Sequence, residues 1–153
     1  MKNFFLKQTI KIFCLCLSLV LAQGCQTPGY VISDSYVSTK LTRAAVVVAL
    51  GPARTVSQNG REVITQFHDR QLKYLDVGAK TKERLYTKVS ILGARRPFDV
   101  AVEVRIERKD PVTNTFVDIG LDEQLSRKQG LLVQEALHQS RDKVESIDGE
   151  VPF

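Results

Sequence analysis

Few side chains in this chain are suited to chemistry: three cysteines and two histidines among 153 residues. Cys14, Cys16 and Cys25 lie near the amino terminus, whereas His68 and His138 lie far apart along the chain. A thiolate can act as a nucleophile or metal ligand, and an imidazole can act as a general base. The spacing of these residues does not fit a zinc site, and we expect neither a metal nor a cofactor.

The first 24 residues have the order of an export signal. Three lysines, Lys2, Lys7 and Lys11, come first, and an apolar run over residues 12–22 follows them and ends at Gln23-Gly24-Cys25. A basic segment, a short apolar segment and a small residue before a cut are typical of a signal peptide. The 13 uncharged residues from Ile12 to Gly24 would span about 20 Å as a helix. Crossing a bilayer takes roughly 20 apolar residues, so a permanent transmembrane anchor is the weaker interpretation.

The end of this segment, Leu21-Ala22-Gln23-Gly24-Cys25, resembles the lipobox of bacterial lipoproteins. In that family a dedicated peptidase cuts before the cysteine, whose thiol carries a diacylglyceryl group with palmitate-like chains. The resemblance implies lipidation of Cys25 and membrane attachment, since two or three acyl chains give an essentially permanent anchor. It also implies the outer rather than the inner membrane of a two-membrane cell, because Gln26 stands where an Asp favours inner-membrane retention.

The cysteine count agrees with this interpretation. Cys14 and Cys16 would leave with the signal, so that Cys25 becomes the single cysteine of the exported chain. A lone thiol in an oxidising compartment indicates either a modification or a liability. The alternative is ordinary signal-peptidase cleavage at the same bond, which would leave a free or intermolecularly bridged thiol.

Charge excludes one class of function. The chain has 22 basic and 17 acidic residues, a net charge of +5. Without the three lysines of the signal, 19 basic residues face 17 acidic ones, a net charge of +2. We therefore expect no nucleic-acid binding.

Three further groups of polar residues are candidates for a site. His68 next to Asp69 could form a base and its orienting partner, although no serine or cysteine can be placed beside it. Glu103 and Glu107 lie about 13 Å apart along a strand, too far apart for the carboxylate pair of a glycosidase, and His138 is expected to face solvent or a satisfied partner. Arg95 and Arg96 are a candidate contact for an anionic partner such as lipid phosphate, with a solvated loop as the alternative.

The first half of the mature chain gives mixed signals. Residues 30–37 could join a sheet edge. The apolar run 44–50 has three valines and ends at Gly51-Pro52, which favours a buried strand. Asn59-Gly60 predicts a type I′ turn in a hairpin over residues 55–65, with a helix over 62–75 as the competing interpretation. Residues 69–82 are predicted to form a loop.

The second half has clearer periodicity. Alternating apolar residues over 85–91 and 98–106, joined by the turn-rich 93–97, predict a long antiparallel hairpin. Asp110-Pro111 ends its second strand, and a third strand is expected over 115–119. A C-terminal helix follows, begun by a capping box of Ser126 and Gln129 or earlier at Asp122. Its apolar face is predicted from helical spacing to comprise Leu132, Val133, Ala136, Leu137, Ser140 and Val144. An irregular tail is expected over 145–153.

These elements predict an α+β fold, an antiparallel sheet of about five strands with the C-terminal helix packed on one face. The expected organisation is a signal peptide over 1–24, a lipidated terminus and tether over 25–43, and one globular domain over 44–153. The function that we expect is a non-catalytic interaction or assembly domain on a lipid-anchored envelope protein with an envelope protein as partner. The first alternative is a lipid- or small-ligand-binding lipoprotein with a cavity between sheet and helix. The second is an enzyme built on His68 and Asp69.

Overall fold

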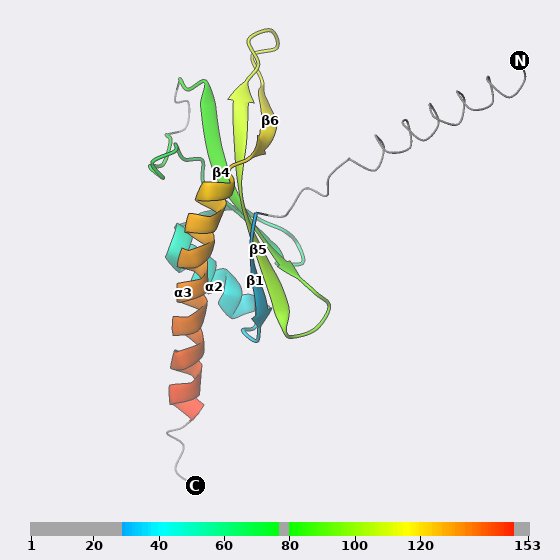
Figure 1. Ribbon diagram of the computed structural model, residues 1–153, viewed down its shortest axis with the longest axis vertical. Helices are drawn as coiled ribbons and strands as arrows, with labels where there is room; N and C mark the ends of the chain where they lie inside the picture. Colours follow the sequence, from blue (N-terminus) through cyan, green and yellow to red (C-terminus); the bar gives the residue numbers. More distant parts are fainter. Residues whose placement is uncertain (1–28, 77–79, 149–153) are drawn as a thin grey trace, which may run out of the picture.

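The computed structural model describes residues 29–76 and 80–148, with side chains described up to Arg141. The predicted signal peptide and Cys25 lie outside these residues. The elements, labelled as in Figure 1, are β1 (Tyr30–Ser35), α2 (Thr39–Leu50), β2 (Ala53–Val56), β3 (Glu62–Thr65), β4 (Glu83–Leu92), β5 (Phe98–Lys109), β6 (Phe116–Leu121) and α3 (Glu123–Asp148).

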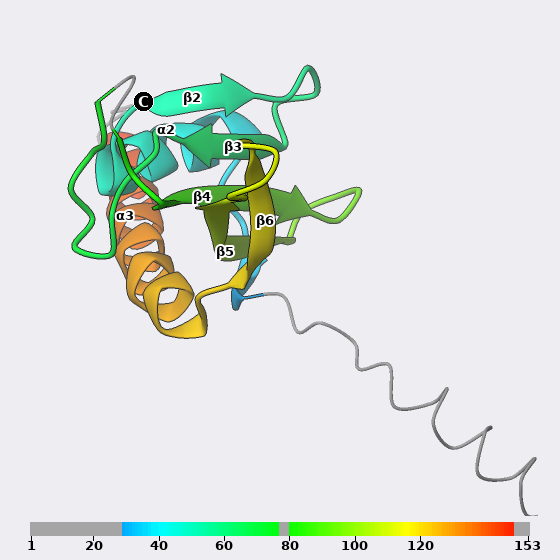
Figure 2. The same ribbon diagram turned by 90° about the horizontal axis from the view of Figure 1, so that it is seen from above.

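The six strands of the described residues form one antiparallel sheet, five of them in the order β1-β5-β4-β3-β2. The sixth strand, β6, pairs with β5 over residues 105–109, whereas β1 pairs with β5 over 98–102. The two strands therefore occupy successive halves of the same edge of β5. Figure 2 shows α2 and α3 together on one face of this sheet. The predicted α+β fold, with a C-terminal helix packed on an antiparallel sheet, is confirmed.

The core lies between the sheet and the two helices. The strands contribute inward-facing valines such as Val89, Val100 and Val102, which are fully buried. The helices contribute Val46 from α2 and Val133 from α3, also almost fully buried. Burying a valine of this kind contributes roughly 1.5–3 kcal/mol, so these contacts hold sheet and helices together.

The predicted strand over residues 44–50 is wrong, because these residues form most of α2. Ser38 caps this helix by accepting a hydrogen bond from Leu41 N at 3.3 Å, and Gly51, with φ of +82°, ends it. Ala45 and Val46 face the core, whereas Val48 is 79% exposed. This helical pattern of burial is set by packing on the sheet, which outweighs the weak preference of valine for strands.

The folded unit also begins earlier than the predicted boundary at residue 44. Residues 30–35 are paired with β5, and α2 begins at Thr39, so most of the predicted tether belongs to the domain. The expectation that residues 30–37 join a sheet edge is confirmed in position, since β1 lies beside β5 alone.

The predicted hairpin over residues 55–65 is confirmed as β2 and β3, and the competing helix over 62–75 is wrong. The turn differs from the predicted type I′. Only Gly60 has a positive φ, +66°, and its N–H donates to the Ser57 carbonyl at 2.8 Å. Because the loop spans residues 57–61, one left-handed residue is enough to return the chain. The described residues of the predicted loop over 69–82 contain a turn and one bridge, from Tyr74 to His68, as expected of a loop.

The long hairpin of β4 and β5 is confirmed with ten paired residues, Glu83–Leu92 against residues 99–108. Asp110 then caps a turn, and its Oδ1 accepts from Val112 N at 2.7 Å. The predicted third strand is β6, shifted to residues 116–121.

The last helix begins at Glu123, and Asp122 is its cap: Asp122 Oδ1 accepts from Leu125 N at 3.0 Å. The capping box of Ser126 and Gln129 is therefore wrong and the earlier start is right. Ser126 is instead buried inside the helix, where its Oγ accepts from Val104 N at 2.8 Å. The helix continues to Asp148, so residues 145–148 of the expected irregular tail are helical.

The predicted apolar face of α3 is confirmed in part. Val133, Ala136 and Leu137 are buried, whereas Leu132 is 46% exposed. The side chain of Val144 lies outside the described ones. Tyr30 of β1 packs directly on Gly130, where an added Cβ would lie 2.1 Å from the Tyr30 ring. The absence of a side chain at Gly130 thus allows the close approach of α3 to β1.

Candidate functional site

A concave surface lies where α3 passes over the segment that joins β1 to α2. Two adjoining hollows, with volumes of about 370 Å³ and about 200 Å³, share Tyr36, Val37 and Arg141 in their walls. We call the two hollows together the α3 groove. The larger hollow is completed by Ser38, Leu41, Arg96 and Ser140, and the smaller one by residues 32–35 with Gln134, Leu137 and His138.

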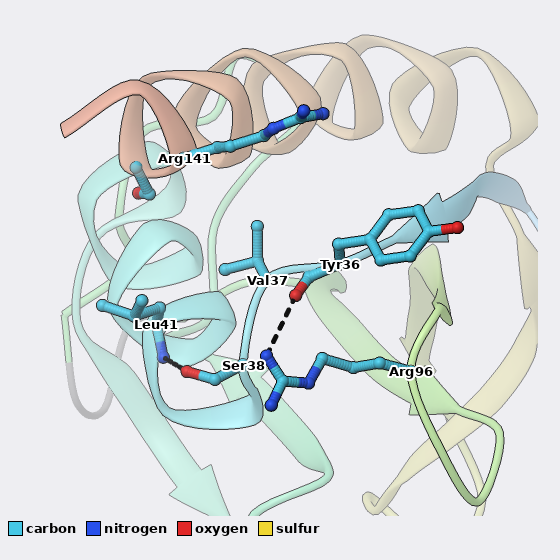
Figure 3. Close-up of a pocket in the computed structure, with 7 residues that line it drawn as sticks. Tyr36, Val37, Ser38, Leu41, Arg96 and Arg141 are labelled. Carbon is cyan, nitrogen blue, oxygen red and sulfur yellow. Dashed lines mark hydrogen bonds between the residues drawn. The ribbon is translucent and has the colours of Figure 1, made fainter. Parts of the chain in front are cut away.

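Two arginines reach this groove from different parts of the sequence. Arg96 comes from the loop between β4 and β5, and its Nη1 donates to the Tyr36 carbonyl at 3.5 Å. Arg141 comes from α3, and Figure 3 shows its side chain extending along the helix on the side of Val37. The groove therefore places two guanidinium groups, each with several N–H donors, around one apolar residue.

The N-terminus of α2 opens into the same hollow. Ser38, its cap, and Leu41, in its first turn, both line the larger hollow (Figure 3). The first turn carries no acidic side chain, so the positive end of the helix dipole adds to the charge of the two arginines. The carboxylate among the lining residues is that of Asp34, in the smaller hollow.

One buried polar group in the smaller hollow has no hydrogen-bond partner among the described residues. Ser35, one of the residues that line this hollow, is 8% exposed, and its buried Oγ is unpartnered among the described residues. A buried hydroxyl without a partner costs about 1–3 kcal/mol. Such an orphaned group at the edge of a hollow is what a site for a polar ligand would present.

The predicted pairing of His68 with Asp69 is not formed. The His68 Nδ1 lies 2.8 Å from the backbone carbonyl of Asp69, not from its carboxylate. That carboxylate instead accepts from the backbone N–H groups of Gln71 and Lys73, at 2.8 and 3.0 Å. Both residues therefore hold the loop that follows β3.

His68 belongs to a second polar region, which we call the His68 cluster: Thr65, His68, Thr87 and Gln129. All four are buried between sheet and helices and line a third hollow of about 180 Å³. Thr87 Oγ1 donates to Gln129 Oε1 and lies 3.4 Å from His68 Nε2. Thr65 Oγ1 accepts from Thr87 N at 2.9 Å and donates to the Gln66 carbonyl at 3.1 Å. Each hydroxyl of this cluster thus has a partner, Thr65 in the backbone of β4 and of Gln66, and Thr87 in the side chain of Gln129 on α3.

The predicted solvated glutamates lie on the sheet face that the helices leave uncovered. Glu107 Oε2 is 2.7 Å from Arg84 Nε, and Glu103 lies 3.9 Å from Arg105. Arg84 is also stacked between Phe67 and Phe116, with ring centroids 3.7 and 3.8 Å from its Cζ. These ion pairs and stacking contacts engage the charged groups of this face with neighbouring side chains.

Two other predicted residues have definite places. Arg95 lies exposed on the same loop as Arg96 but, unlike Arg96, does not line the groove. His138 is exposed and lines the smaller hollow. Within the described residues no cluster of His, Cys, Asp and Glu could hold a metal ion. None of the helices described is both long and apolar enough to cross a bilayer.

Sequence reasoning missed Ser35, Tyr36 and Arg141. Each is an ordinary surface residue type in the sequence, and the sheet order and the path of α3 bring them together. The one available signal was the Arg95-Arg96 pair, which identified one side of the groove.

Comparisons with known proteins give no family for this chain. No family model, no curated protein and no solved structure matches it.

Proposed function

We propose that this protein is a lipid-anchored bacterial envelope protein whose domain serves as a non-catalytic interaction module at the membrane surface. The observation that carries the proposal is the position of Cys25 relative to the fold. The first strand, β1, begins at Tyr30, five residues after the cysteine of the lipobox-like sequence. At about 3.3–3.6 Å per extended residue, this linker spans at most roughly 18 Å.

A linker of that length decides how the domain would work. An acyl-anchored Cys25 would keep β1 and the start of α3 within one small-domain diameter of the bilayer. The domain would then meet partners at the membrane surface and not across the full width of an envelope compartment. The outer membrane is the expected location, because Gln26 follows the cysteine.

The contacts of His68 and Asp69 support an interaction module over an enzyme. Both side chains are engaged in holding the loop after β3, and the two hydroxyls near His68 bond to backbone groups and to Gln129. Groups held in this way stabilise a fold, whereas a general base needs access to a substrate proton.

Fractionation of cells that produce the full chain tests the proposal. The wild-type protein should sediment with membranes and resist extraction by high salt. A Cys25→Ser variant should lose this association or accumulate unprocessed. The matched control is Cys16→Ser, which changes a cysteine of the predicted signal and should leave membrane association unchanged. Wild-type protein in the soluble fraction would contradict the proposal.

A separate variant tests the location of the protein within the envelope. In a two-membrane cell, Gln26→Asp should move the protein from outer-membrane to inner-membrane fractions. An unchanged distribution would remove the outer-membrane part of the proposal and leave the anchor itself standing.

A second candidate function is the binding of a lipid or small ligand. The α3 groove favours it, because its larger hollow, at about 370 Å³, falls within the range of roughly 300–1,000 Å³ of ligand pockets. The groove lies beside α3 and the end of β1, whereas the hollow between sheet and helices is the smaller one at the His68 cluster.

A further inference from the structure

We propose that the α3 groove is a binding site for a phosphate group on an amphiphilic ligand, of which a phospholipid headgroup is the form available at a membrane. This inference deepens the second candidate function and does not require Cys25 to be lipidated. It rests on three features of the groove: its donors, its unpartnered hydroxyl and its apolar wall.

The donors come from three separate elements. Arg96 lies in the β4–β5 loop, Arg141 lies in α3, and the N-terminus of α2 opens between them. Guanidinium groups bind phosphate through paired N–H donors, and a helix N-terminus adds backbone donors and a favourable dipole. Arg96 uses one long contact, to the Tyr36 carbonyl at 3.5 Å, and the other donors of its guanidinium can reach a ligand.

The unpartnered hydroxyl is the independent sign of a ligand. Ser35 is one of the residues that line the smaller hollow, and its buried Oγ has no partner among the described residues. A rotation of this side chain toward the hollow would bring the hydroxyl to a ligand oxygen, the acceptor that it lacks, and would remove the cost of its burial.

The apolar wall selects a ligand that is not phosphate alone. Val37 and Leu41 line the larger hollow, and Leu137 lines the smaller one. Tyr36, 63% exposed, stands at the rim. A phosphate at the arginines would therefore leave its glycerol and first methylenes against Val37 and Leu41, a combination that fits a phospholipid headgroup.

The test is an NMR titration of the full chain, purified in a neutral maltoside detergent. The probes are inorganic phosphate and dihexanoyl phosphatidylglycerol, each added to separate samples. We expect saturable amide shifts confined to residues 35–41, 94–96 and 134–141, with the short-chain lipid binding at least tenfold more tightly than phosphate. Equal affinities would identify free phosphate as the source and still support the phosphate site.

Variants assign the shifts to the groove. Arg96→Gln and Arg141→Gln should each weaken binding of either probe at least fivefold, while the rest of the amide spectrum shows an intact fold. Arg127→Gln removes the same charge from α3 outside the groove and should leave affinity unchanged. Absence of shifts with both probes, or shifts that both groove variants leave intact, would overturn the proposal.

The same samples separate this inference from the proposed function. Their intact mass reports whether Cys25 carries lipid, independently of the titration. Binding without lipidation would support the site and contradict the anchor, whereas lipidation without binding would do the reverse.

Discussion

The His68 cluster and the α3 groove are both polar regions beside the two helices, and they differ in how their polar groups are satisfied. In the His68 cluster, Thr65, Thr87 and Gln129 bond to one another or to backbone groups. In the groove, the buried Ser35 hydroxyl has no partner among the described residues, and two arginines and a helix N-terminus line a hollow. A polar network that closes on itself specifies the packing of a core, whereas a buried hydroxyl without a partner beside a hollow is suited to a ligand.

The largest effect on stability is expected from a variant that breaks a hydrogen bond of the His68 cluster. Gln129→Leu keeps the volume of the buried side chain but removes the acceptor of the Thr87 hydroxyl. We expect the free energy of unfolding to fall by about 1–3 kcal/mol, measured by urea denaturation.

Its control is the double variant Thr87→Val with Gln129→Leu, which removes both partners and should recover most of the loss. Neither form should change phosphate binding in the groove. If the affinity of the groove for phosphate falls and recovers together with the stability of these variants, the groove and the His68 cluster are energetically coupled.

A smaller effect is expected on the uncovered sheet face. Arg84→Gln removes a guanidinium stacked between Phe67 and Phe116 and paired with Glu107. We expect a loss of about 1–2 kcal/mol in thermal unfolding. Arg84→Lys, which keeps the charge without the planar stack, should recover less than half of it. Full recovery by lysine would mean that charge, not stacking, holds this face.

For the unpartnered hydroxyl beside the α3 groove, we expect a change of stability in the opposite direction. Ser35→Ala removes an unpartnered buried hydroxyl, so the unliganded protein should be unchanged or up to about 1 kcal/mol more stable. The same change should weaken binding of dihexanoyl phosphatidylglycerol. Thr42→Val removes a second buried hydroxyl that has no partner among the described residues and should match the stability effect without the binding effect. A loss of stability in Ser35→Ala would show that its hydroxyl already has a partner in the fold.

The smallest expected effect is on the stability of the protein at acidic pH. Burial raises the pKa of Glu83, but hydrogen bonds from Arg108 and Arg70 outweigh it and hold the pKa below its usual 4.5. A carboxylate with a lowered folded pKa contributes stability above its unfolded pKa and loses it as the pH falls through the folded value. The unfolding free energy should therefore drop on acidification below about pH 5. In Glu83→Gln this decline should be slightly shallower. An identical decline in both proteins would show that Glu83 does not contribute to the pH dependence of stability.

Much of the fold could be predicted because apolar and polar residues alternate along two long strands. Residues 85–91 and 98–106 alternate strictly, and the structure pairs them as β4 and β5. The run 44–50 was misassigned because its valines favour strands locally, whereas the cap at Ser38 and the packing of Val46 on the sheet make it a helix.

The groove is less accessible to sequence reasoning. Arg96 could be singled out from its pairing with Arg95 in a turn. Ser35 and Arg141 are more than one hundred positions apart and line the same hollow only because β1 lies at the sheet edge that α3 covers. No local pattern encodes that arrangement.

The measurement that tests the central claim most directly is the intact mass of the mature protein from a membrane fraction, beside the Cys25→Ser form. A lipid-anchored protein should have the mass of the chain from Cys25 to Phe153 plus a diacylglyceryl group and an acyl chain, and the variant should lack this modified species. An unmodified chain of that length in the soluble fraction would contradict the account and leave the domain as an exported protein with a free thiol.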